Sequence, residues 1–181
     1  MSTELHDFED GKGPVQAARH SNGGGWVACT AYVNASAYVG PDAQVFGNAQ
    51  VFGNAQVSGN ARVFGDAQVS GNARVFGDAW VYGNAQVSGN ARVFGDAWVY
   101  GNARVYGKCE RTPIFIGGLM YPVTITDTHL RAGCQNHTFA SWRAMKDDEI
   151  ETMDGKKATE FYPLLIGLID LLCKDREVAN V

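Results

Sequence analysis

The stretch Val45-Phe46-Gly47-Asn48-Ala49-Gln50 decides the fold, because its six-residue pattern repeats through the centre of the chain. A small residue follows each valine of the pattern by four positions; it is alanine from Ala31 to Ala103 and then Cys109. A period of six fits neither an α-helix nor a plain strand that alternates its two faces. The fourteen valines stand at positions 27, 33, 39, 45, 51, 57, 63, 69, 75, 81, 87, 93, 99 and 105.

This period is typical of a short strand followed by a tight corner. Within the strand, alanine and valine share one face, and the residues on either side of valine share the other. The Gly-Asn or Gly-Asp pair then turns the chain, since both residue types tolerate left-handed backbone conformations. Three strands and three corners close one triangular coil. The sequence therefore predicts an all-β solenoid of four to five stacked coils, with valine and alanine pointing inward.

The repeats resemble those of hexapeptide-repeat proteins, whose fold is a left-handed parallel β-helix. The resemblance covers residues 26–109, which contain no insertion between hexads. It implies the left-handed winding, whereas the general rule for parallel crossovers would give the opposite hand. Proteins of this type commonly form trimers, with ligands in the grooves between subunits.

Residues eighteen apart should stack in columns on the three outer faces. One face collects seven aromatic side chains, a cluster that is unusual on the surface of a monomer. We interpret this face as an assembly face, buried against other copies in a homotrimer or against a terminal segment of the same chain. Its residues are Trp26, Phe46, Phe64, Trp80, Tyr82, Trp98 and Tyr100.

Another face carries Arg74 and Arg92 beside Phe76 and Phe94. Guanidinium groups and aromatic rings can hold a phosphate or a base, so these four residues are a candidate ligand column. The competing interpretation is a solvated face on which Asp78 and Asp96 neutralise the arginines.

Four segments are expected: a lead-in over residues 1–25, the repeats over 26–109, a β-hairpin or strand cap over 110–137, and a helical module over 138–181. In the lead-in, Val15 to Ala18 favour a short strand, and Gly23-Gly24-Gly25 suggests a flexible link. In the helical module, Gly155 predicts a helix end, Pro163 a break or a new start, and the apolar run 161–172 a helix buried on all sides.

The ends of the chain carry a second resemblance. Asn22-Gly23-Gly24-Gly25-Trp26-Val27 and the motifs Tyr121–His129, Gly133–His137, Trp142 and Met153-Asp154-Gly155 are similar to a family of repeat proteins encoded by phages and prophages. Members are often labelled transferase-like or polymer-forming. The resemblance implies no particular activity, because fold and repeat type do not determine function.

Catalytic residues are missing from the repeats. Hexapeptide acyltransferases need a histidine base, and carbonic anhydrases of the same fold need three histidines on zinc. This chain has no histidine between His20 and His129. We therefore expect no catalytic residues and no cofactor. A hexapeptide-type acyltransferase that uses His129 or His137 of the C-terminal module is the alternative.

Metal binding has one set of candidate residues, His129, Cys134 and His137. Zinc accepts histidine and cysteine ligands. However, alternation along a regular strand would place His129 and Cys134 on opposite faces, so we expect a packed cysteine and hydrogen-bonded histidines instead of a metal site.

Composition excludes some function classes. The net charge of −4 argues against general nucleic-acid binding, and no stretch is apolar and long enough to span a bilayer. The N-terminal residues lack the apolar region of a secretion signal. Together these features suggest a non-enzymatic phage or prophage accessory protein in the cytoplasm of a bacterial host cell, a trimeric scaffold that binds a host protein or a small molecule and counters host defence. A structural virion component is a further alternative.

Overall fold

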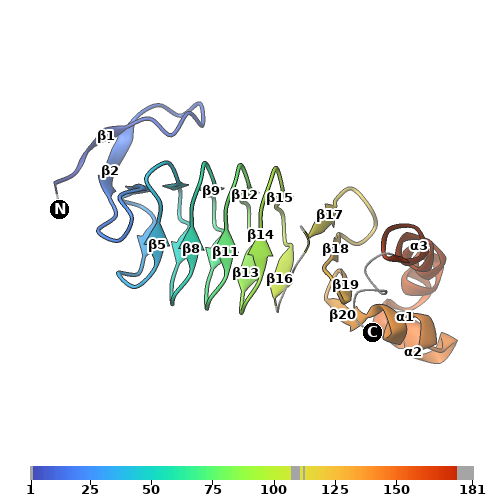
Figure 1. Ribbon diagram of the computed structural model, residues 1–181. Coiled ribbons are helices and arrows are strands. Elements are labelled where there is room, and N and C mark those ends of the chain that lie inside the picture. The colour runs from blue at the N-terminus through green and yellow to red at the C-terminus, as the bar shows by residue number, and fades with distance from the viewer. Residues whose placement is uncertain (1, 107–110, 112, 175–181) are drawn as a thin grey trace. The chain divides into compact units, whose positions relative to one another are not determined.

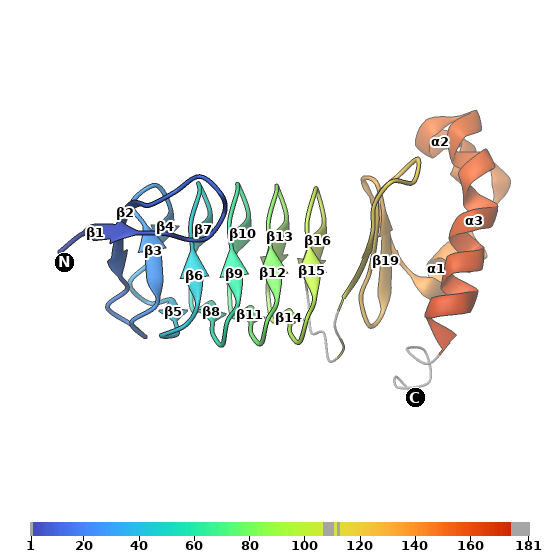
Figure 2. The ribbon, with the colours of Figure 1, turned by 90° about the horizontal axis from the view of Figure 1, so that it is seen from above.

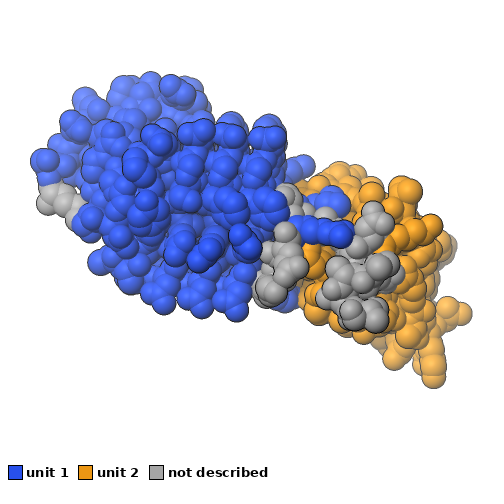
Figure 3. Space-filling view, viewed as in Figure 1, with its two compact units in different colours: residues 1–114 blue, residues 115–181 orange. Residues whose placement is uncertain are grey.

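The computed structural model describes residues 2–106, 111 and 113–174. The chain divides into two compact units, residues 1–114 and residues 115–181 (Figure 3). Cys109, which ends the repeat pattern in the sequence, and the first residue of the expected cap, at position 110, lie outside the described residues.

The N-terminal unit is a β-solenoid of about four turns, built from fourteen short strands in three parallel sheets (Figure 1). The first sheet stacks β3 (Trp26–Ala28), β6 (Gln44–Val45), β9 (Arg62–Val63), β12 (Trp80–Val81) and β15 (Trp98–Val99). The second stacks β4 (Tyr32–Val33), β7 (Gln50–Val51), β10 (Gln68–Val69), β13 (Gln86–Ser88) and β16 (Arg104–Tyr106). The third stacks β5 (Tyr38–Val39), β8 (Gln56–Val57), β11 (Arg74–Val75) and β14 (Arg92–Val93).

Successive coils are joined by backbone hydrogen bonds, and each strand lies beside the strand eighteen residues later (Figure 2). The Gln44 amide donates to the Ala61 carbonyl at 3.0 Å, and the Phe46 amide donates to the Val63 carbonyl at 3.0 Å. Isolated strands of two or three residues would be unstable. Stacking supplies each of them with partners, so a single coil would not be stable by itself.

The core is the predicted double ladder of valine and alanine. Each valine from Val39 to Val105 at the six-residue spacing is at most 1% exposed, and the alanines from Ala37 to Ala103 are also buried. Val27 and Val33, at the start of the solenoid, are half-buried.

Glycine at the corners is required for two reasons. Gly77 adopts φ of +75°, a left-handed conformation that side chains disfavour. The corner of the next coil also lies close above it, since a Cβ at Gly77 would sit 2.9 Å from the Gly95 nitrogen. The corner glycines therefore allow both the turn and the tight stacking of turns.

An N-terminal cap covers two of the three sheet edges at the first coil. Strand β1 (Glu4–His6) pairs antiparallel with β2 (Val15–Arg19), and β2 pairs antiparallel with β3, so the predicted strand near Val15 is present. On the third sheet, the Gly25 amide donates to the Val39 carbonyl at 2.9 Å. The cap thus satisfies backbone groups that an open solenoid end would leave for other chains.

The expectation of a flexible Gly23-Gly24-Gly25 link is wrong. A Cβ at Gly23 would lie 2.2 Å from the Val39 carbonyl oxygen, and a Cβ at Gly25 would lie 2.2 Å from the Gly40 carbonyl oxygen. These glycines are present because the segment packs directly against the backbone of the first coil.

The C-terminal sheet has four strands in the order β17 (Ile114–Ile116), β18 (Val123–Ile125), β19 (His129–Ala132) and β20 (Gln135–Thr138). Gly133, at φ of +55°, follows β19 and begins a tight turn into β20. The two strands pair antiparallel, so the cap expected over residues 110–137 contains more strands than a single hairpin.

Three helices follow: α1 (Phe139–Ala144), α2 (Asp147–Asp154) and α3 (Lys156–Leu172). The predicted helix end at Gly155 is confirmed, but α3 continues through Pro163 without a break. Pro163 is exposed and removes one amide donor from the interior of this helix. Burial of α3 on all sides was also a wrong expectation, since Leu164 and Leu171 are 48% and 77% exposed. No helix in the described part of the chain is long and apolar enough to cross a membrane.

The two roles of the corner glycines can be separated by mutation. Gly77 and Gly95 have similar left-handed conformations in one corner column. Of these two, Gly77 would bring a Cβ against the backbone of the next coil, whereas a Cβ at Gly95 would meet no described atom. Both Gly77→Ala and Gly95→Ala should lose about 1–2 kcal/mol to backbone strain. We expect Gly77→Ala to lose more, as measured by the free energy of unfolding in denaturant. Equal losses would show that close stacking does not require glycine.

Candidate functional site

The aromatic face of the first sheet is continuous, as the sequence predicted from the eighteen-residue spacing. Ring centroids are 4.8 Å apart between Phe46 and Phe64, 4.9 Å between Phe64 and Tyr82, and 5.2 Å between Tyr82 and Tyr100. In the neighbouring column, Trp80 and Trp98 stack at 5.2 Å. Parallel strands in register bring like residues together, and offset stacking of their rings adds to the stability of the coils.

The first part of this face is covered by the chain's own N-terminus. Phe8 is 2% exposed and stacks on Phe46 at 4.7 Å, while His6 stacks on Trp26 at 4.1 Å. The Arg62 guanidinium lies over Phe46 and donates a hydrogen bond to the Phe8 carbonyl. Trp26 and Phe46 therefore pack against a terminal segment, which was one of the two partners considered for this face.

The later part of the face remains more open. We call Trp80, Tyr82, Trp98 and Tyr100 the distal ladder. Trp98 is 54% exposed, and the other three are partly exposed. Burial raises the pKa of Tyr82 above its usual value. The distal ladder is the portion of the predicted assembly face that the N-terminal segment leaves accessible.

The candidate ligand column is also assembled, with Arg74 and Arg92 in register on adjacent strands. Phe76 and Phe94 stack at 5.4 Å, and the Arg92 guanidinium lies 5.6 Å from the Phe76 ring centroid. Within the described residues, no ion pair joins either arginine to Asp78 or Asp96, and Asp78 accepts a hydrogen bond from Asn60 at 2.9 Å. Two adjacent guanidinium groups repel each other, and an anion bound between them would reduce that repulsion. An anionic ligand on this column stays a prediction.

The three candidate metal ligands do not converge. His129 and Cys134 lie at opposite ends of the β19–β20 hairpin, because His129 pairs with Thr138 and Cys134 occupies the turn. His129 Nδ1 is 2.7 Å from Thr128 Oγ1, and the His137 ring packs on Trp142. Burial lowers the pKa of His137, and nearby His129 lowers it further. Across the described residues, no group of three metal-binding side chains is present.

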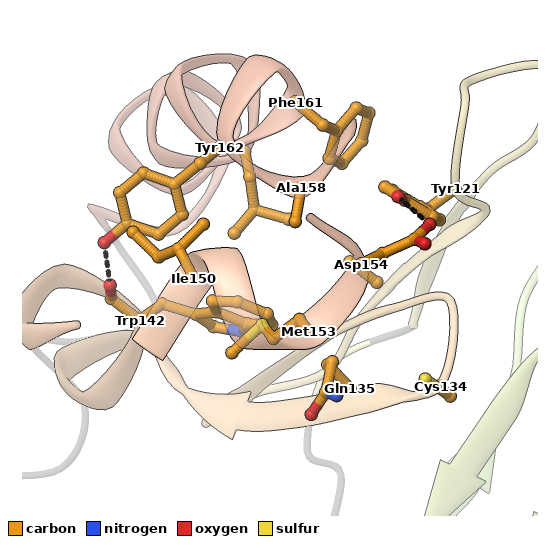
Figure 4. A pocket seen from close by; sticks show the side chains of 12 residues that line it. Tyr121, Cys134, Gln135, Trp142, Ile150, Met153, Asp154, Ala158, Phe161 and Tyr162 are labelled. Carbon is orange, nitrogen blue, oxygen red and sulfur yellow. Dashed lines mark hydrogen bonds between the residues drawn. The ribbon is translucent and has the colours of Figure 1, made fainter. Parts of the chain in front are cut away.

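A cavity of about 310 Å³ in the C-terminal unit was not predicted from the sequence (Figure 4). It lies between the β19–β20 hairpin and the three helices, with Tyr121 and Asp154 on its polar side. Its residues include Tyr121, Trp142, Met153 and Asp154, which belong to the C-terminal motifs that resemble those of other repeat proteins. The cavity forms where residues distant in sequence meet, so no local pattern could reveal it.

Comparison with known proteins supports the repeat assignment. The family model described as the YdcK β-solenoid repeat matches residues 55–67, 67–83, 85–101 and 97–111. The central repeats are thus similar to YdcK β-solenoid repeats, in agreement with the three stacked sheets. No curated protein and no solved structure matches the chain.

Docking of the N-terminal segment should depend on pH through His6. Burial lowers the pKa of His6 below 6.5, and the charge of Arg19 lowers it further, against the opposite effect of Asp7, Glu4 and Glu9. His6 Nε2 is buried without a hydrogen-bond partner, so protonation would be unfavourable. The unfolded chain therefore binds the proton first, and stability should fall as the pH drops below 6.5.

The measurement is unfolding at about pH 7.5 and about pH 5.5, where a histidine of ordinary pKa changes charge. His6→Gln removes the titrating ring, so it should be less stable at the higher pH but lose less on acidification than the unmodified protein. His137 titrates in both proteins and cancels from the comparison. An identical pH dependence in the two proteins would contradict the role of His6.

Proposed function

We propose that this protein is a non-enzymatic scaffold, which self-associates into a homotrimer through the distal ladder and presents its other faces to a partner. The exposed aromatic ladder is the observation that carries the proposal. Aromatic side chains bury roughly 150–250 Å² each, so four of them supply a large part of a typical interface of about 800 Å² per partner. Their stacking fixes them in place, and little side-chain entropy is lost on association.

The solenoid geometry suits such a role. The Trp80–Trp98 pair lies on strands whose inward neighbours are buried valines, so the rings project from a closely packed wall. A rigid surface loses less free energy on binding than a mobile loop does. The first coils of the same sheet are occupied by Phe8 and His6, which leaves the distal ladder as the part of this sheet open to another copy.

The proposed partner is a host protein or a small molecule in a bacterial cell. The support for an accessory role in phage or prophage biology is the resemblance of residues 22–27 and of the C-terminal motifs to repeat proteins from those sources. Because the repeats contain no histidine, the acyltransferase alternative depends on His129 or His137 of the C-terminal module as the base.

Self-association can be tested with two matched variants. Trp98 and Tyr32 are 54% and 58% exposed, but Tyr32 lies on the second sheet. Trp98→Glu should convert the trimer to a folded monomer at micromolar concentration, because it places a charge within the apolar interface. Tyr32→Glu should leave the trimer unchanged. Light scattering with circular dichroism measures both effects, and a monomeric unmodified protein would reject the proposed assembly.

Catalysis is tested separately with acetyl-coenzyme A. We expect no release of free coenzyme A above the uncatalysed rate in the presence of amine or hydroxyl acceptors. His137 packs against Trp142 and has a lowered pKa, so it is the first histidine to replace if turnover is found. Turnover that His137→Ala or His129→Ala abolishes would favour the acyltransferase alternative.

A further inference from the structure

The C-terminal cavity has the composition of a small-molecule site (Figure 4). Its volume of about 310 Å³ is at the lower end of the range for ligand pockets, roughly 300–1,000 Å³, so it fits one compact ring system. Apolar side chains from all three helices form its walls, including Trp142, Ile150 and Phe161. Ligand pockets combine such walls with a few polar groups that fix the ligand's orientation.

The aromatic walls are held in place by hydrogen bonds to backbone carbonyls and by contacts with one another. Trp142 Nε1 donates to the Leu130 carbonyl at 2.7 Å in a buried position, and the Tyr162 hydroxyl donates to the Trp142 carbonyl. Phe161 meets Tyr121 edge to face, with ring centroids 5.1 Å apart. The cavity is therefore preformed, and a ligand would not have to order these rings.

Asp154 is the charged residue among the twelve described residues that line the cavity. The Tyr121 hydroxyl donates to Asp154 Oδ2 at 2.5 Å. This hydrogen bond raises the pKa of Tyr121 to about 12, with burial and the Asp154 charge adding to the effect. Because the Tyr121 hydroxyl binds Oδ2, the other carboxylate oxygen of Asp154 can accept a hydrogen bond from a ligand.

We propose that this cavity binds a small aromatic amine, with its ring between the apolar walls and its ammonium group on Asp154. A carboxylate attracts a cation, and aromatic rings around it add cation–π attraction. An anion would be repelled by Asp154, and a purely aliphatic molecule would make no polar contact with its second carboxylate oxygen. Nearby Gln135 and Cys134 offer further polar contacts at the rim.

This proposal stands apart from self-association. The lining residues all belong to the unit formed by residues 115–181, whereas the distal ladder belongs to the unit formed by residues 1–114. A monomeric protein could still bind the amine, and a trimer could fail to do so. The two proposals therefore succeed or fail in different experiments.

Three probes of nearly identical shape test the chemistry. Tryptamine, tryptophol and indole-3-propionate share an indole ring and a two-carbon arm, and they end in an ammonium, a hydroxyl and a carboxylate. Isothermal titration of the full-length protein should give an affinity for tryptamine about tenfold higher than for tryptophol, from the charge-assisted hydrogen bond. Indole-3-propionate should bind more weakly than either.

Two variants on the same helix assign the effect to Asp154. Asp154→Asn keeps a hydrogen-bonding side chain but removes the charge, so tryptamine and tryptophol should bind with equal affinity. Glu151→Gln removes a charge from an exposed position of α2 outside the cavity and should leave the tenfold preference intact. Ala158→Leu, which narrows the cavity, should weaken the binding of all three probes.

Several results would overturn the proposal. They are no heat of binding from tryptamine or tryptophol at millimolar concentration, a preference for indole-3-propionate, or an equal loss of preference in Asp154→Asn and Glu151→Gln. Circular dichroism of each variant shows whether it is folded. If Ala158→Leu does not fold, the comparison of Asp154→Asn with Glu151→Gln still decides the outcome.

Discussion

The hydrogen bonds between successive coils are the constraint on which the N-terminal unit depends. The short strands receive their partners from neighbouring coils, as the bonds from Gln44 to Ala61 and from Phe46 to Val63 illustrate. The bonds fix an eighteen-residue register, and the register forces valine onto valine in the core and glycine onto glycine at the corners. The repeat in the sequence is the chemical consequence of this single geometric condition.

The same register makes like side chains neighbours on the surface, with opposite effects for different residue types. Aromatic rings gain from the arrangement, because Phe64, Tyr82 and Tyr100 stack at about the spacing of the strands themselves. Charged residues are destabilised by the arrangement, because Arg74 lies beside Arg92 and their like charges repel. A solenoid therefore concentrates function in its columns: an apolar column is a ready interface, and a charged column favours a counter-ion.

The C-terminal unit follows different rules. Its cavity is bordered by side chains from a hairpin and three helices, and hydrogen bonds to backbone carbonyls fix its aromatic walls. Asp154 meets Tyr121 across 33 residues of sequence. In this protein a repetitive unit that offers extended surfaces is thus joined to a non-repetitive unit that offers a pocket, and we infer that the two units have separate binding roles.

The sequence by itself determined the solenoid, because each hexad encodes the same short strand and corner, and fourteen copies in a row specify one fold. It placed the valine core, the corner glycines and the aromatic columns, since all three follow from period and stacking. It did not reveal that Phe8 and His6 cover Trp26 and Phe46, or that Gly23 and Gly25 pack against the first coil. Nor did it indicate the cavity beside Asp154. These features depend on contacts between segments with no shared pattern, and only the tertiary structure decides which of those segments meet.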